Sequence, residues 1–265
     1  MSNLLVNGID LYYEQHGKGR TLLMIAGLAS DSQSWQPIVE ELSQHYHVVL
    51  LDNRGSGRTK PLDVEITIEA MADDVIALIK YLNLSSVDIV GHSMGGFIAL
   101  DCSIRYPEYV SKLILVGTSA FNSTCNNALF SDWVSYLESD MNKKLWFKSI
   151  FYWIFTKEFF EDTEVVEFAL NFAVEYPYPQ TDIAFKNQVK VIKTFNCLKN
   201  LPHVKSKTLA IFGEKDLLFS PQESIKILSA IPILKMVTIP SAAHSVHTQQ
   251  PKAFIRSIEA FLEEV

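Results

Sequence analysis

The sequence predicts an α/β fold, a doubly wound and mostly parallel sheet that carries an inserted helical cap. Two observations predict it. Short apolar runs, typical of strands buried on both faces, alternate with helical patterns over residues 21–116 and again from residue 208. Between these parts, residues 121–201 contain helical patterns and no obvious strand. We therefore expect a core of residues 1–120 and 202–265 and a helical cap of residues 121–201.

The first elements of the core are predicted by local signals. Residues 3–16 alternate weakly around Asn7-Gly8, which favours a hairpin. Thr67 precedes an amphipathic run and is the expected N-cap of its helix, and Pro107 ends the helix after the third apolar run. Strands are expected at 21–26, 47–51, 87–91 and 110–116, and helices at 37–44, 67–82 and 94–105.

The same alternation resumes after the expected cap. Strands are predicted at 208–212 and 235–239, and a helix begins near Pro251. In a parallel sheet of this kind, ligands bind beyond the carboxyl ends of the strands. The loops that follow the strands should therefore meet along one edge and form the site.

Composition argues against several classes of function. The net charge is −7 and no cluster of basic residues is present, so nucleic-acid binding is not expected. Cys102, Cys125 and Cys197 are widely spaced, which indicates neither a disulfide framework nor a metal site and fits a reducing compartment. The sequence shows no signal peptide and no membrane-spanning stretch. We therefore expect a cytoplasmic protein without a metal, a cofactor or a membrane partner.

A Gly-x-Ser-x-Gly pattern lies where the third strand meets its helix. Gly91 and Gly95 flank Ser93, so the chain can turn sharply there and project the serine hydroxyl. The N–H of Met94, at the helix start, points toward the same space. The pattern alone is a weak signal, because a glycine-rich turn with a serine N-cap has the same composition. It predicts a nucleophile elbow only if partners for Ser93 exist elsewhere.

Two later strand ends supply candidate partners. A serine hydroxyl needs a base, and the base needs an orienting acid. Asp216 follows the strand at 208–212 and His244 follows the strand at 235–239, so the order is serine, acid, histidine. Glu214 is the competing acid and His247 the competing base. We favour Asp216 and His244, because Glu214 lies closer to its strand and His247 lies three residues further from its own.

Together these features resemble the α/β-hydrolase superfamily over essentially the whole chain. The resemblance implies that Ser93 is the nucleophile, His244 the general base and acid, and Asp216 the orienting carboxylate. It also implies an oxyanion hole made by the N–H groups of Leu28 and Met94. The motifs that carry it are Gly91-His92-Ser93-Met94-Gly95-Gly96, Asp52-x-Arg54-Gly55-x-Gly57, Gly213-x-x-Asp216-x-x-x-x-Pro221 and His244-x-x-His247-x-x-Gln250-Pro251.

The sequence departs from the family pattern at two positions. Ala26 stands where the family usually has a histidine that supports the loop presenting Leu28. Leu28 would donate through its backbone, so it can still serve, but the support of the loop is put in doubt. Gln249 stands where relatives often carry glutamate. A misplaced loop that loses one donor would slow the reaction by about 10²–10³.

The resemblance implies a serine hydrolase that cleaves a carboxylic ester, lactone or thioester through an acyl-enzyme. The subgroup that looks most similar contains enol-lactonases and small carboxylesterases. The aromatic cap favours a small, largely apolar substrate, and we expect Trp133, Phe147 and Leu217 to contact it. The alternatives are a non-catalytic ligand-binding protein, an acyltransferase and a carbon–carbon bond hydrolase. The sequence specifies neither the physiological substrate nor the oligomeric state.

Overall fold

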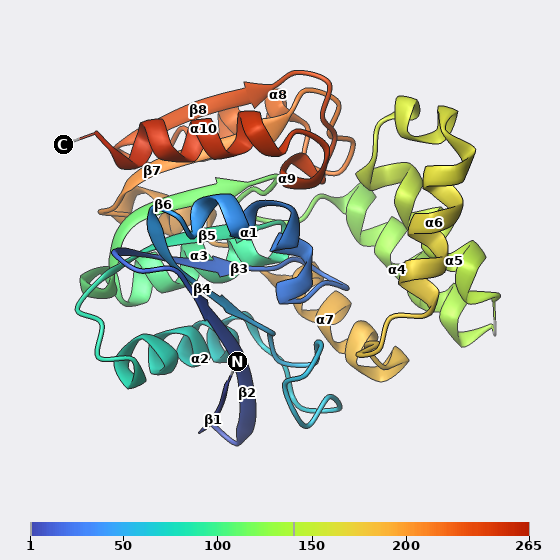
Figure 1. The fold of residues 1–265 in the computed structure, drawn as a ribbon, viewed down its shortest axis with the longest axis horizontal. Coiled ribbons are helices and arrows are strands. Elements are labelled where there is room, and N and C mark those ends of the chain that lie inside the picture. Colours follow the sequence, from blue (N-terminus) through green and yellow to red (C-terminus); the bar gives the residue numbers. More distant parts are fainter. Residues whose placement is uncertain (1, 140, 265) are drawn as a thin grey trace.

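An eight-stranded sheet forms the centre of the molecule (Figure 1). The computed structural model describes residues 2–139 and 141–264. The strand order is β1-β2-β4-β3-β5-β6-β7-β8; β2 pairs antiparallel with β1 and β4, and the other described pairings are parallel. This order confirms the doubly wound, mostly parallel sheet. The strands are β1 (Ser2–Val6), β2 (Ile9–His16), β3 (Arg20–Ile25), β4 (Tyr46–Leu51), β5 (Val87–His92), β6 (Val110–Val116), β7 (Lys207–Gly213) and β8 (Leu234–Ile239).

Helices cover both faces of the sheet and create two apolar cores. Along β3, Leu22 and Met24 pack on the side of α1 and α10, whereas Leu23 and Ile25 pack on the side of α2 and α3. This alternation follows from the two-residue period of a strand. Burying each such side chain stabilises the fold by about 1.5–3 kcal/mol. The covering helices are α1 (Gln36–Leu42), α2 (Ile68–Tyr81), α3 (Met94–Arg105), α8 (Pro221–Leu228) and α10 (Pro251–Leu262).

Short helices connect these elements. The N-cap predicted for α2 is present. The hydroxyl of Thr67 accepts the N–H of Ala70 at 3.0 Å and so begins α2, as expected. Asn7 and Gly8 form the turn between β1 and β2 with positive φ, as the hairpin signal predicted. The short helices are η1 (Ser32–Trp35), η2 (Pro107–Tyr109), η3 (Lys157–Glu161), η4 (Leu198–His203) and α9 (Val246–Gln249).

Four further α-helices lie between β6 and β7 and form a group beside the sheet (Figure 1). We call them the helical insertion: α4 (Thr124–Glu138), α5 (Lys143–Ile154), α6 (Thr163–Val174) and α7 (Asp182–Thr194). The chain enters and leaves this group at one place, where Phe121 bridges Asn196 and the N–H of Cys197 donates to the carbonyl of Ala120 at 2.9 Å. The domain boundaries at 121 and 201 stay a prediction. Among the described helices, none is long and apolar enough to cross a membrane.

Candidate active site

Ser93 lies at the tip of a strained turn between β5 and α3. Its φ of 54° and ψ of −118° fall outside the regions that most residues adopt, which costs about 1–3 kcal/mol. Hydrogen bonds from β6 and the loop after it hold the turn: the Ser93 N–H donates to Val116, and the Thr118 hydroxyl donates to the Ser93 carbonyl, both at 2.9 Å. A Cβ on Gly91 would lie 2.2 Å from the carbonyl oxygen of Gly95. The strand and helix therefore approach closely only because glycines occupy the turn.

Asp216 and His244 form a buried pair at the ends of β7 and β8. Asp216 Oδ2 accepts a hydrogen bond from His244 Nδ1 at 3.0 Å, and both side chains are almost inaccessible. Asp216 Oδ1 accepts the N–H groups of Leu218 and Phe219, each at 2.9 Å. A Cβ on Gly117 would lie 3.1 Å from His244 Nδ1 and 3.2 Å from Asp216 Oδ2. The carboxylate is thus fixed, and it holds the imidazole with Nε2 as the free nitrogen.

The loop that carries His244 is held from two sides. The ring N–H of His92 donates to the His244 carbonyl at 3.0 Å, through Nε2. The N–H of Ser245 donates to the carbonyl of Ile154, at the end of α5, at 3.1 Å. The histidine loop is therefore tied both to the elbow and to the helical insertion.

Gln249 makes a third tie to the same loop. Its Oε1 accepts the N–H of Ala243 at 2.9 Å, and its Nε2 donates to the hydroxyl of Thr156 at 3.2 Å. The side chain thus bridges the residue before His244 and the segment after α5. The sequence marked Gln249 only as a departure from the family pattern, and nothing local indicated this bridging role.

Three histidines and one tryptophan pack together behind the site. The His92 ring lies 4.7 Å from that of His244 and 4.9 Å from that of His247, between centroids, and Trp35 lies 4.5 Å from His247. Burial, with a smaller contribution from the neighbouring His244, lowers the pKa of His92 well below its ordinary value and the pKa of His247 to about 3. Both rings therefore stay neutral across the physiological range.

The alternative acid and base lie away from the buried pair. His247 packs against Trp35, and its Nδ1 has no hydrogen-bond partner among the described residues. Glu214 accepts the N–H of Ser241 at 3.3 Å on the exposed side of the loop. The structure thus brings Asp216, rather than Glu214, to His244.

A cavity of about 210 Å³ opens over Ser93 and His244. Trp133 and Phe147 line it from the helical insertion, and their contact with a substrate stays a prediction. Leu217, which was also expected to contact the substrate, does not line this cavity: its side chain is 63% exposed, and Leu218 lines the cavity instead. The reason is the tight turn after Asp216, in which the carboxylate binds the N–H groups of the two residues that follow Leu217. We call this space the inner cavity.

The two candidate oxyanion donors flank Ser93. Leu28 lines the inner cavity, and a Cβ on Gly27 would lie 3.1 Å from Ser93 Cβ, so the loop after β3 passes directly beside the elbow. Met94 begins α3, where backbone N–H groups have no partner within the helix. Within residues 2–139 and 141–264, neither the Leu28 nor the Met94 N–H donates to a protein acceptor.

Asn53 supports the loop that presents Leu28. Its Nδ2 donates to the carbonyl of Ala26 at 3.0 Å, in a buried position after β4. This contact supplies support at the position where the family's usual histidine is replaced by Ala26. No local pattern in the sequence indicates this role of Asn53, although Asn53 follows a strand end, where site residues were expected to gather.

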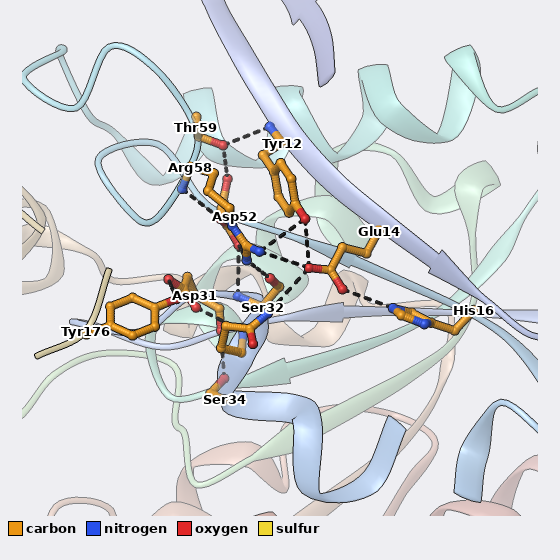
Figure 2. Close-up of polar contacts among 11 residues, drawn as sticks. Tyr12, Glu14, His16, Asp31, Ser32, Ser34, Asp52, Arg58, Thr59 and Tyr176 are labelled. Carbon is orange, nitrogen blue, oxygen red and sulfur yellow. Dashed lines mark hydrogen bonds and ion pairs between the residues drawn. The ribbon is translucent and has the colours of Figure 1, made fainter. Parts of the chain in front are cut away.

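A second cavity adjoins the first. It has a volume of about 300 Å³ and shares the lining residues Ala29, Ser30, Phe147, Ala173 and Phe185 with the inner cavity. Its wall includes Asp31, which belongs to a buried polar cluster around Arg58 (Figure 2). We call this space the outer cavity. In the part of the chain that the structure describes, no group of three or more His, Cys, Asp or Glu side chains could hold a metal ion.

Comparisons with known proteins agree with the fold. The chain is 25% identical over 257 residues to a protein of Agrobacterium fabrum provisionally named carbamate hydrolase RutD, covering 95% of this chain and 98% of that protein. It is 28% identical over 247 residues to a protein of Haemophilus influenzae provisionally named esterase/lipase, covering 92% and 83%. The crystal structure of the enol-lactonase from Burkholderia xenovorans LB400 superposes with a TM-score of 0.88 at 22% identity, covering 99% of this chain and 100% of that one. At this identity the likeness shows the fold alone.

A family model described as alpha/beta hydrolase fold matches residues 20–251, which is most of the chain. This protein therefore belongs to the α/β-hydrolase fold family.

Proposed function

We propose that this chain is a serine hydrolase that cleaves a carboxylic ester, lactone or thioester through an acyl-enzyme. The observation that carries the proposal is the buried Asp216–His244 pair at 3.0 Å, whose His244 lines the inner cavity together with Ser93 of the strained elbow. A serine hydroxyl becomes nucleophilic when an oriented imidazole can take its proton. The packing of His244 against Gly117 and the two N–H donors to Asp216 supply that orientation.

In the proposed reaction, Ser93 Oγ attacks the carbonyl carbon while His244 Nε2 takes the hydroxyl proton. The bond from that carbon to the leaving oxygen, or sulfur in a thioester, then breaks, and His244 returns the proton to the departing alcohol or thiol. Water attacks the acyl-enzyme in the same way, its proton passes through His244 to Ser93, and the acid is released. The N–H groups of Leu28 and Met94 would stabilise the oxyanion, each contributing about 10²–10³ in rate.

The walls of the inner cavity support a small and largely apolar acyl or alcohol portion. Its lining from the helical insertion is aromatic or aliphatic, and these side chains exclude water from the reacting carbonyl. The residues concerned are Phe130, Trp133, Phe147, Ile150, Phe151 and Ile154.

Carbamate hydrolysis is the second candidate. The Agrobacterium fabrum relative that covers 95% of this chain carries that provisional name. The same serine and histidine would form a carbamoyl-enzyme and release it to water. A substrate panel of matched p-nitrophenyl esters and carbamates therefore separates the two candidates by their ratio of kcat/KM.

Hydrolysis of p-nitrophenyl butyrate tests the proposal directly. The wild type should release p-nitrophenol and react covalently with a fluorophosphonate probe at Ser93, and Ser93→Ala should do neither. Ser119→Ala is the matched control, because Ser119 is also buried and follows a strand, and its hydroxyl has no partner among the described residues. Absence of both turnover and labelling in the wild type would favour a non-catalytic ligand-binding protein. Transfer of the acyl group to an added alcohol in preference to water would indicate an acyltransferase.

A further inference from the structure

The outer cavity carries an unusual polar wall. On one side it meets the inner cavity through Ala29 and Phe147, so a chain-like substrate attached at Ser93 can extend into it. On another side it reaches Asp31, which follows the loop after β3 and is only 6% exposed. The character of this wall indicates what kind of group the cavity accepts.

The guanidinium of the cluster, that of Arg58, pairs with Asp52 and Glu14 (Figure 2). Arg58 donates through Nε and Nη2 to Asp52, at 2.9 and 3.2 Å, and through Nη1 to Glu14 at 3.1 Å. It also donates to the hydroxyls of Ser32 and Tyr12 and lies over the rings of Tyr12 and Tyr178, at 3.9 and 5.1 Å from their centroids. Three carboxylates thus gather around one guanidinium.

Asp31 is the carboxylate of this cluster that forms no ion pair with Arg58. Oδ1 accepts the N–H of Gln33 at 2.9 Å and Oδ2 accepts the hydroxyl of Tyr176 at 2.6 Å, and among the described residues it forms no ion pair. A Cβ on Gly57 would lie 2.8 Å from Asp31 Oδ2 and 2.3 Å from Asp52 Oδ2, so both carboxylates flank one glycine. Burial, followed by the charge of Asp52, raises the pKa of Asp31, and the hydrogen bonds from Tyr176 and Gln33 and the charge of Arg58 offset only part of this rise. Burying three carboxylates around one guanidinium is costly, and a cationic ligand would reduce that cost.

A second acceptor at the same cavity lacks a donor. Gln180 Nε2 donates to the carbonyl of Gly55 at 2.6 Å, which fixes the orientation of the amide. Its Oε1 is buried and has no partner within the described residues, and Gln180 lines the outer cavity. One unpaired acceptor therefore lies buried behind the same wall that carries the Asp31 carboxylate.

Aromatic rings complete the wall. Tyr176 and Tyr178 lie 6.0 Å apart in an edge-on arrangement, and Phe172 lies 6.1 Å from Tyr176. All three line the outer cavity, and aromatic ring faces attract cations. The Tyr178 ring already has the Arg58 guanidinium over it, which leaves Tyr176 and Phe172 for a ligand. The two other charged residues of the lining, Lys143 and Asp182, are exposed and opposite in sign, so they offset each other.

We propose that the outer cavity binds a protonated primary amine of the substrate while the ester carbonyl lies at Ser93. The ammonium group would pair with the Asp31 carboxylate and contact the Tyr176 ring. This inference rests on the proposed function and narrows it: the substrate is an apolar ester whose far end carries a positive charge. A primary amine fits better than a quaternary one, because only the former can donate a hydrogen bond to the carboxylate.

Three six-carbon probes test the charge preference without any need for turnover. Binding of n-hexylammonium, 1-hexanol and hexanoate to Ser93→Ala is measured by calorimetry near neutral pH. We expect hexylammonium to bind at least about tenfold more tightly than hexanol, and hexanoate to bind weakest, as an uncompensated carboxylate predicts. Equal binding of the three probes would overturn the proposal even if the protein hydrolyses esters.

Matched variants locate the preference. Asp31→Asn should abolish the advantage of hexylammonium over hexanol, and asparagine preserves the N-cap that Asp31 provides to η1. Asp182→Asn removes the same charge from the exposed rim and should leave the preference intact. Tyr176→Phe keeps the ring and should also retain it, because Asp31 loses only a competing donor. A preference that survives Asp31→Asn would contradict the proposal, whereas loss of esterase activity alone would leave these binding ratios unaffected.

Discussion

Two polar clusters lie along the same edge of the sheet, and they are built in opposite ways. The histidine cluster packs the rings of His92, His244 and His247 together, with the Asp216 carboxylate on His244 alone, and burial keeps His92 and His247 neutral. The Arg58 cluster places three carboxylates around one guanidinium. The histidine cluster has almost no fixed charge apart from that of Asp216, whereas fixed charges hold the Arg58 cluster together.

The difference matches the tasks that the two regions would perform. A proton can move through an imidazole only if its neighbours do not hold a competing charge, so neutral rings suit the surroundings of a base. Fixed charges suit the recognition of a charged group and the anchoring of loops, because they do not change during a reaction. Five substitutions test this contrast, and they follow in order of decreasing effect.

Asp216→Asn should have the largest effect. The amide cannot stabilise an imidazolium at His244 or hold its Nδ1–H, so kcat should fall by about 10⁴ while KM changes little. Steady-state kinetics with p-nitrophenyl butyrate measures both constants. Glu214→Gln is the control, since Glu214 lies nearby on the exposed side and should be neutral. Equal losses in the two variants would remove the special role of Asp216.

Arg58→Met should destabilise the protein strongly. It leaves Asp52 and Glu14 buried without their cation, which costs about 3–5 kcal/mol of unfolding free energy. Lys215→Met is the control, because its pair with Glu158 is exposed and contributes at most about 1 kcal/mol. Urea unfolding at neutral pH measures both values, and similar losses would show that the Arg58 cluster is not held by charge.

His247→Phe should reduce the sensitivity of the fold to acid. The pKa of His247 is lowered to about 3 in the folded state, so below its ordinary value the unfolded chain binds a proton that the folded chain does not. Stability is therefore lost as the pH falls from about 6.5 toward 3, by about 2 kcal/mol at pH 5. Phenylalanine keeps the packing on Trp35 and removes the titration. Unfolding free energies at pH 7 and pH 5 measure the difference, and an unchanged difference would contradict the prediction.

Gln249 should affect catalysis through position rather than chemistry. Gln249→Ala removes both of its hydrogen bonds, and kcat should fall about tenfold with little change in KM, since a misaligned base costs transition-state stabilisation alone. Gln249→Glu keeps the acceptor for Ala243 and loses the donor to Thr156, so it should recover part of the loss. A rise in KM without a fall in kcat would indicate a role in binding instead.

Asp31→Asn should have the smallest effect on stability, and a favourable one. The pKa of Asp31 is raised in the folded state, so its ionisation costs stability as the pH rises above the ordinary carboxyl range. Asparagine removes that cost and should raise the unfolding free energy by about 1 kcal/mol at pH 7, with the gain fading below about pH 4. Urea titrations at both pH values measure the gain. A loss of stability at pH 7 would mean that Asp31 is already compensated within the protein.

The features that could be predicted are those determined by short, local stretches of sequence. Thr67 begins α2 as expected, and Ser93, Asp216 and His244 each follow a strand, so the parallel sheet brings them to one edge without further information. A position just after a strand is a strong indication of a site residue, because in a parallel sheet the carboxyl ends of the strands lie along the same edge.

The parts that sequence could not supply depend on contacts between distant residues or on one-residue detail. Glu14, Asp31, Arg58 and Tyr176 meet only because the fold brings four separate segments together (Figure 2). Leu217 was expected in the pocket, but the turn imposed by the Asp216 carboxylate places its neighbour there.

The ties between the histidine loop and the chain around α5 limit how this protein can be recombined. The loop depends on the carbonyl of Ile154 and on the bridge from Gln249 to Thr156. A chimera that exchanges the helical insertion for that of a relative would cut both ties, although its junctions would lie far from the histidine in sequence. Residue 249 should therefore be exchanged together with the helical insertion. A chimera that receives only the helical insertion would therefore have a displaced His244, even if it acquired the substrate specificity of the relative.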